Sequence, residues 1–341
     1  MYIYAGIDEA GYGPMYGPLV VARCTLIIPA LPHDAPPPQL WQRLSKAVCK
    51  RLSGRKGRIA VNDSKKLKTK AAGVKHLESG VLSFAGLQGE MPVDVAQWLD
   101  RVVETRHRLT NEGADGVPSL DALPWYAATD QSPWAPMPTA NTADELAIAR
   151  SMLATTCQRI GVEMGGFAAR VFYEDELNHR LEMTRSKAAV SFMAVAAHLV
   201  DLFREHGEHH PHISVDRQSG RTRYREPLAQ AFEGAAVDIL GETDAYSAYR
   251  ISAGSGASKR SMTVTFQTQA EESHMPTALA SMAAKLTREL LMQRFNAYFA
   301  NVAPDVKPTA GYGTDANRWR DEMLPNLRRA EIDHGRLRRR A

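Results

Sequence analysis

The sequence predicts an α/β protein built on one mixed sheet, and three observations lead to this class. The chain opens with two apolar, β-prone segments, Tyr2 to Ile7 and Leu19 to Ile28, separated by a loop rich in Gly and Pro. Later β-prone segments alternate with segments of helical periodicity. The 341 residues are 44% hydrophobic and 23% charged, which is typical of a soluble globular protein. An opening hairpin followed by alternating strands and helices is typical of an α/β sheet.

The first third of the chain is expected to be irregular after the hairpin. Residues 29–38 contain five prolines and predict a loop. Residues 40–52 have helical spacing with a basic face, and residues 58–61 predict a short strand. Five more prolines fall between residues 118 and 138, so residues 111–141 predict an insertion without regular secondary structure.

Helices and strands alternate over the rest of the chain. Thr142 and Glu145 form a capping-box signature, which predicts the start of a helix. The expected elements are a helix over 143–159, a strand over 168–173, a helix over 186–205, a strand over 213–215 that ends at Asp216, short β-like segments at 237–240 and 262–266, a long helix over 276–299 with Pro at its start, and a helix after Gly313.

The cysteines and the N-terminus predict a soluble cytoplasmic protein. Cys24, Cys49 and Cys157 are odd in number and match no zinc pattern, as expected in a reducing compartment. The longest apolar segment, residues 19–31, is interrupted by Arg23 and is too short to span a bilayer. The first residues lack the pattern of a signal peptide. We therefore expect no membrane association, and we expect a monomer.

The basic residues are concentrated in two segments. Residues 43–70 hold eleven Lys and Arg against one acid, and residues 328–341 hold six Arg against two acids. The net charge of the whole chain is only +4, so the remainder is acidic. Such segments indicate an anionic partner, with nucleic acid first, while a solvated helix face and a loose tail are the alternative. The arginines at 336–340 predict a flexible contact with a nucleic-acid backbone.

Four acids occupy positions at which α/β folds keep their sites. Asp8 and Glu9 end the first strand, Asp216 ends a later strand, and Glu289 lies in the long helix beside Lys285. Carboxylates gathered at one place repel each other unless cations hold them, and hard oxygen ligands select Mg²⁺ or Mn²⁺. A two-metal carboxylate site on a protein with basic segments is the chemistry of phosphodiester hydrolysis.

Each of these acids also has a structural interpretation. Asp8 and Glu9 precede a glycine, as turn residues do, and Asp216 is followed by Arg217, as in a surface ion pair. Glu289 stands four residues after Lys285, the spacing of an ordinary helix pair. The spacing of the acids therefore leaves both interpretations open.

Five sequence segments resemble a known family. They are Gly6–Pro14 (GIDEAGYGP), Gly17–Ala22 (GPLVVA), Asp63–Leu67 (DSKKL), Ala280–Glu289 (ASMAAKLTRE) and Gly311–Thr314 (GYGT). In this order they resemble the motifs of type 2 ribonucleases H, the ribonuclease HII group. Close likeness covers about a quarter of the chain, and the sequence is similar to that of a divergent member.

The resemblance implies a ribonuclease H-like fold, with a mixed five-stranded sheet flanked by helices and a helical C-terminal part. We expect a catalytic core over residues 1–290, with insertions at roughly 76–141 and 217–272. Residues 291–341 are expected to form the helical part with its basic tail.

The resemblance also implies a metal-dependent endonuclease that cleaves the RNA strand of RNA/DNA hybrids, or at ribonucleotides embedded in DNA. The implied cofactor is Mg²⁺ or Mn²⁺ in a two-metal site. The catalytic and metal-binding acids carry over to Asp8, Glu9, Asp216 and Glu289. The residues assigned to substrate binding are Gly11, Tyr12, Gly13, Ser64, Lys65, Lys66, Lys285, Arg288 and Tyr312.

The chain departs from the family pattern at two of these positions. Tyr12 stands where the family has Arg or Lys, and Glu289 stands where it usually has Asp. We expect ribose recognition to persist in weakened form, and Tyr12→Arg to sharpen it. Two other functions stay open, a ribonuclease H-fold nuclease with another nucleic-acid substrate and a hybrid-binding protein with weak catalysis.

Overall fold

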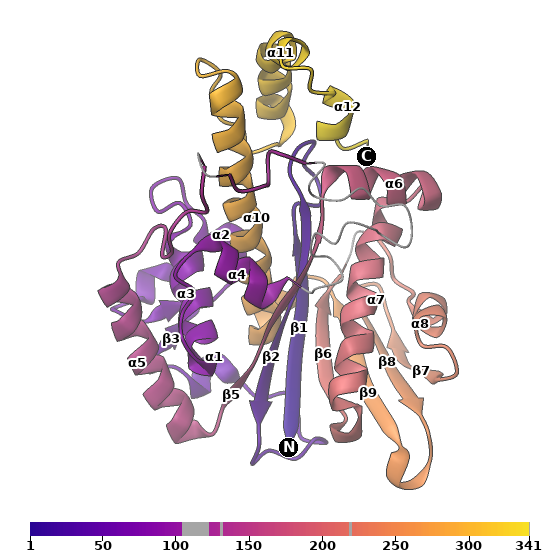
Figure 1. Ribbon diagram of the computed structural model, residues 1–341. Helices are drawn as coiled ribbons and strands as arrows, with labels where there is room; N and C mark the ends of the chain where they lie inside the picture. The colour runs from indigo at the N-terminus through magenta and orange to yellow at the C-terminus, as the bar shows by residue number, and fades with distance from the viewer. Residues whose placement is uncertain (104–122, 130–131, 218–219, 341) are drawn as a thin grey trace.

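A seven-stranded mixed sheet forms the centre of the molecule (Figure 1). The computed structural model describes residues 1–103, 123–129, 132–217 and 220–340. The strand order is β5-β2-β1-β6-β9-β8-β7. The strands are β1 (Tyr2–Ala10), β2 (Leu19–Ile28), β5 (Glu163–Phe172), β6 (His212–Asp216), β7 (Ala236–Glu242), β8 (Tyr246–Ala253) and β9 (Arg260–Gln267), and a separate two-stranded sheet pairs β3 (Val48–Cys49) with β4 (Ile59–Ala60). The predicted α/β class is confirmed.

The sheet has two strands more than the five that the resemblance implied. The predicted hairpin is present, with β1 antiparallel to β2, while β6 lies parallel to both β1 and β9. Residues 217–272 supply β7, β8 and β9, and β7 and β8 extend the edge of the sheet as an antiparallel pair. Short β-prone segments separated by turn residues form strands here because each finds a partner in the main sheet.

Helices cover both faces of the sheet. The helices are α1 (Leu40–Arg43), α2 (Ser64–Leu67), α3 (Lys75–Ala85), α4 (Val95–Val102), α5 (Ala143–Ile160), α6 (Glu174–Thr184), α7 (Lys187–His206), α8 (Arg225–Ala231), α9 (Ala270–Ser273), α10 (Met275–Val302), α11 (Gly313–Arg329) and α12 (His334–Leu337). One apolar core joins α10 and α3 to β1 and β2, and a second joins α7 and α8 to the opposite face of the sheet. Figure 1 shows α7 in front of the sheet and α10 behind it.

Helix α10 packs directly against β1 because Gly6 has no side chain. A Cβ atom at Gly6 would lie 2.0 Å from the backbone nitrogen of Thr277, so any larger residue would push the helix away. This contact brings the beginning of α10 against the middle of β1, one turn before Ser281. The position of α10 relative to the strand ends is thereby fixed.

Helices α5, α7 and α10 begin and end close to their predicted limits. The prediction of a helix over 40–52 is wrong. That region holds only the single turn α1, after which Val48 and Cys49 pair with β4. Leu44, Ala47 and Val48 are all buried. The pairing and burial of this apolar segment outweigh its helical spacing.

The predicted insertion over 111–141 is described only in part. Residues 111–122 and 130–131 lie outside the described residues. Trp125 is buried and its ring lies 6.1 Å from that of Phe299 in α10.

Among the described residues, no single helix is long and apolar enough to cross a membrane. Helix α6 and the segment 187–209 reach that length and composition only as a pair, and the pair is bent by 109°.

Candidate active site

Two acids lie near one another where the parallel pairing of β1 with β6 ends. The register pairs Ile7 with Val215, so the next residues, Asp8 and Asp216, follow side by side. Asp8 is only 7% exposed. Burial raises the pKa of Asp8 well above its usual value, and the neighbouring charges of Asp216 and Glu9 raise it further. The structure thus gathers three of the four predicted acids.

A fourth acid of this cluster, Glu271, was not predicted from the sequence. It lies in the short helix α9, whose Ala270 N–H donates a hydrogen bond of 3.0 Å to Asp216. The Glu271 carboxyl hydrogen-bonds to Asp216, and burial together with the Asp216 charge raises the pKa of Glu271 to about 7. Like Asp8 and Asp216, Glu271 closely follows a β-prone segment, 262–266. That signal was available in the sequence.

Serine hydroxyls connect the acid cluster to the DSKKL segment. Ser281 in α10 hydrogen-bonds to Asp8, and the hydroxyls of Ser281 and Ser64 share a hydrogen bond of 3.1 Å. Asp63 caps α2 by accepting a bond of 2.9 Å from the Lys65 N–H. Burial raises the pKa of Asp216, and the nearby positive charge of Lys65 opposes that rise. Three segments that resemble family motifs therefore meet at one site.

Glu289 belongs to a different group of charges. It pairs with Lys68 at 2.6 Å and with Lys285 at 2.9 Å. Burial acts to raise its pKa, but these two lysines outweigh burial and hold it below its usual value. Glu289 comes eight residues after Ser281, about 12 Å further along the helix axis. The structure therefore places Glu289 apart from Asp8, Glu9 and Asp216.

The glycine-rich loop between β1 and β2 lies beside this second group of charges. Gly11 has φ +89°, and a Cβ there would lie 2.6 Å from Arg288 Nε. Tyr312, which is 39% exposed, has the guanidinium of Arg288 5.0 Å and the amine of Lys285 5.7 Å from its ring centre. The predicted substrate residues on the loop, α10 and the GYGT segment are thus neighbours.

Two loop residues differ in their surroundings. Tyr12 packs partly against the core on the α7 side, with the Lys187 amine 5.2 Å from its ring centre. Gly13 is exposed, and a Cβ there would meet no atom within 4 Å.

Lys66 of α2 points to Glu272, with which it forms an ion pair at the surface.

The acid cluster suits a divalent cation in its chemistry. The donors of Asp8, Glu9, Asp216 and Glu271 are all carboxylate oxygens, the ligands that Mg²⁺ and Mn²⁺ prefer. Within the described residues, the buried Oε2 atom of Glu271 has no hydrogen-bond partner, and the Glu271–Asp216 contact requires a proton between two carboxyls. The acids therefore match a divalent cation in the chemistry of their donors but not in their spacing, because no three His, Cys, Asp or Glu side chains of the described residues are grouped closely enough to hold a metal ion.

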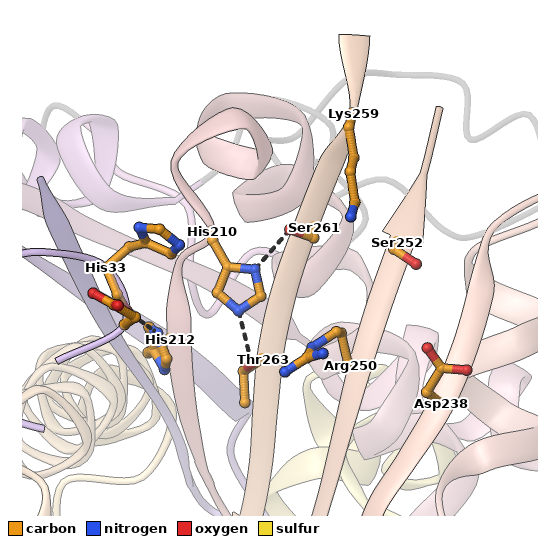
Figure 2. Close-up of a pocket in the computed structure, with 10 residues that line it drawn as sticks. His33, His210, His212, Asp238, Arg250, Ser252, Lys259, Ser261 and Thr263 are labelled. Atoms are coloured by element: carbon orange, nitrogen blue, oxygen red, sulfur yellow. Dashed lines mark hydrogen bonds between the residues drawn. The ribbon is translucent and has the colours of Figure 1, made fainter. Parts of the chain in front are cut away.

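The histidine-rich turn before β6 forms a separate pocket of about 570 Å³ at the opposite end of that strand (Figure 2). His210 is bonded through both ring nitrogens, to the Ser261 hydroxyl at 2.6 Å and the Thr263 hydroxyl at 2.9 Å. Burial and nearby positive groups lower its pKa to about 4. His212 bonds to the carbonyl oxygen of His33 at 2.7 Å. These bonds hold the ring nitrogens of His210 and stabilise the end of the sheet.

The fold is similar to solved ribonucleases H of types 2 and 3. The ribonuclease H2 from Pyrococcus horikoshii OT3 aligns with a TM-score of 0.46 and 14% identity, covering 99% of this chain and 92% of that chain. A PCNA:RNase HII complex from Archaeoglobus fulgidus aligns at 0.41 and 14%, covering 99% and 94%. Bst-RNase HIII in complex with Mn²⁺ aligns at 0.41 and 12%, covering 99% and 66%. No protein-family model and no curated protein sequence matches the chain.

Proposed function

We propose that this protein is a Mg²⁺- or Mn²⁺-dependent endonuclease that cleaves RNA in RNA/DNA hybrids or at ribonucleotides embedded in DNA. The observation that carries the proposal is the gathering of Asp8 on β1, Asp216 at the end of β6 and Glu271 in α9, whose carboxyl groups lie close enough to shift one another's pKa values. The resemblance of the surrounding segments to type 2 ribonuclease H motifs supports the same activity.

Asp8, Glu9, Asp216 and Glu271 would hold the metal ions in this proposal. Bound there, the ions would activate a water molecule and stabilise the leaving oxygen of a phosphodiester. Ser281 orients the Asp8 carboxyl through its hydrogen bond, and Ser64 in turn holds Ser281. Glu271 takes the role that the sequence had assigned to Glu289, which serves instead to hold Lys68 and Lys285.

The residues around the acids would bind the nucleic acid. Lys65 lies near Asp216, where its amine would pair with a phosphate. The glycine-rich loop would offer its exposed backbone at Gly13 to a ribose 2′-hydroxyl, the group that distinguishes RNA from DNA. The exposed ring of Tyr312 offers a stacking surface beside that loop.

A cleavage assay with three labelled duplexes tests the proposal. The purified protein is incubated with Mg²⁺ or Mn²⁺ and DNA carrying one ribonucleotide, a long RNA/DNA hybrid, or plain DNA. We expect metal-dependent cleavage of one or both ribonucleotide-containing duplexes and its loss in Asp8→Asn. Equal cleavage of all three would favour a ribonuclease H-fold nuclease with another substrate, and binding without cleavage would favour a hybrid-binding protein.

A further inference from the structure

The C-terminal end of the chain is packed against the glycine-rich loop. Leu337 is fully buried and Arg339 is only 1% exposed. The Arg339 guanidinium donates to the carbonyl oxygens of Gly11 at 2.6 Å, Tyr12 at 3.2 Å and Gly17 at 3.4 Å. The expectation that the arginines at 336–340 form a flexible nucleic-acid contact is therefore wrong for Arg339, whose charge is directed into the protein.

Contacts with α6 hold the residues on both sides of Arg339. Arg336 pairs with Asp175 at 2.9 Å, and the Asn178 amide donates to the Arg338 carbonyl at 2.9 Å. The same Asn178 side chain accepts from the Arg340 N–H at 2.8 Å. The chain is thus bound to α6 at each side of the buried arginine, which leaves the guanidinium little freedom to withdraw from the loop.

Two further ionisable side chains bind the same loop from the interior of the protein. Glu174 accepts hydrogen bonds of 2.8 Å from the Gly17 N–H and from the Tyr126 hydroxyl. Arg288 donates to the Tyr16 carbonyl at 3.1 Å. Both side chains are fully buried. The loop backbone over residues 11–17 is therefore held by three buried ionisable side chains that come from distant parts of the chain.

Burying these ionisable groups costs desolvation free energy, which points to a role in positioning the loop rather than in stability. Burial and the neighbouring Arg288 charge lower the pKa of Arg339 to about 10. Buried ion groups contribute little net stability, because desolvation offsets their attraction. A loop with positive φ at Gly11 and Gly17 is flexible by itself, since glycine is conformationally permissive. Charge-assisted hydrogen bonds to its carbonyls restrict that freedom.

We propose that Arg339 is a positioning residue for substrate, which fixes the glycine-rich loop in the conformation that distinguishes a ribose from a deoxyribose. This inference rests on the proposed function, because the loop is the part of that site assigned to the 2′-hydroxyl. Arg339 itself does not contact the substrate. Its effect passes through the carbonyls of Gly11, Tyr12 and Gly17, which set the direction of the adjoining peptide groups.

The test compares Arg339→Ala and Arg339→Lys with Arg340→Ala in the full-length protein. Arg340 provides the matched control, because its side chain is 60% exposed and its backbone bond to Asn178 survives the change. Hydrogen exchange of residues 11–17 is measured together with the ratio of cleavage rates on one-ribonucleotide and plain DNA duplexes. Thermal unfolding verifies that each variant is folded.

We expect Arg339→Ala to speed exchange in the loop and to lower the cleavage ratio about tenfold, because small displacements of a positioning group reduce rates strongly. Arg339→Lys keeps the charge but offers a single donor group. It should therefore retain part of the slow exchange in the loop and part of the cleavage ratio. Unchanged exchange in both variants, or a loosened loop with an unchanged ratio, would overturn the inference. If the wild-type protein cleaves neither duplex, the proposed function fails, while the exchange comparison still decides whether Arg339 holds the loop.

Discussion

The Glu271 carboxyl hydrogen-bonds to Asp216, so two acids from α9 and the end of β6 meet at one point. A contact of this kind is unfavourable between two charged carboxylates and favourable when a proton or a cation lies between them. Glu271 rather than Glu289 therefore completes the acid cluster in the proposed mechanism. Substitution of Glu271 and substitution of Glu289 are therefore expected to change the cleavage rate by different amounts.

Glu271→Gln is expected to lower the metal-dependent cleavage rate by roughly 10²–10³-fold, because a metal ligand contributes several kcal/mol to the transition state. Glu272→Gln is the matched control, since Glu272 is the adjacent acid and forms an exposed ion pair with Lys66. Glu289→Gln should have a smaller effect, through the loosening of Lys68 and Lys285. Steady-state cleavage rates at saturating Mn²⁺ measure all three. A larger loss of cleavage rate in Glu289→Gln than in Glu271→Gln would identify Glu289 as the fourth catalytic acid.

The same cluster predicts that the metal-free protein is stabilised by loss of an acid. Burial, Asp216 and Glu9 raise the pKa of Asp8, so ionising this carboxyl costs more free energy in the folded chain than in the unfolded chain. Asp8→Asn should therefore raise the melting temperature of the metal-free protein by about 2 °C, for a gain of order 1 kcal/mol. Thermal unfolding in EDTA measures this change. A lower melting temperature in the variant would show that the acids do not repel each other in the folded protein.

The pH dependence of stability follows from the raised pKa of Glu271. A carboxyl whose pKa is higher in the folded than in the unfolded chain binds more protons when folded, so the free energy of unfolding falls as pH rises between the two values. For Glu271 this interval runs from 4.5 to about 7. We expect Glu271→Gln to flatten the curve of metal-free stability over that interval, measured by denaturant unfolding at fixed ionic strength. An unchanged curve would contradict the assignment.

The sequence predicted the fold class because the features that indicate it are local. The hairpin, the α5 cap and the long helix α10 each follow from residues close together in the chain. Asp8, Glu9 and Asp216 were recognised as acids at the ends of β-prone segments. Glu271 obeys the same rule, whereas Glu289 falls inside a segment that resembles a family motif.

The features that the sequence did not predict depend on distant contacts. The segment over 40–52 has helical spacing, yet pairing with β4 turns part of it into a strand. Arg339 belongs to a basic C-terminal segment whose composition is typical of a mobile tail. Only the folded chain shows that Asp175 and Asn178 on α6 hold its neighbours and direct Arg339 inward.

Lys65 is predicted to bind a phosphate of the substrate. Lys65→Ala should weaken binding to a hybrid and reduce the slope of log Kd against log salt concentration by about 1, because one released counterion is lost. Lys46→Ala is the control, since Lys46 is an exposed lysine of the same basic segment and lies beside α5, near Met152. Fluorescence anisotropy with labelled hybrid over a salt series measures the slopes. Equal slopes for Lys65→Ala and wild type would assign the Lys65 charge to solubility.

The packing of Tyr12 changes what is expected of Tyr12→Arg. Sequence comparison alone suggests that arginine would sharpen ribose selectivity, but the ring packs partly against the α7-side core and lies 5.2 Å from the Lys187 amine. An arginine there would bring a second cation beside Lys187 and remove apolar contact, so we expect a lower melting temperature and no gain in selectivity. Tyr12→Phe keeps the ring and should retain both properties of the wild type. Two measurements on both variants test this expectation. They are the melting curve and the ratio of cleavage rates on one-ribonucleotide and plain DNA duplexes. A higher ratio in Tyr12→Arg with an unchanged melting temperature would show that the side chain at this position reaches the substrate.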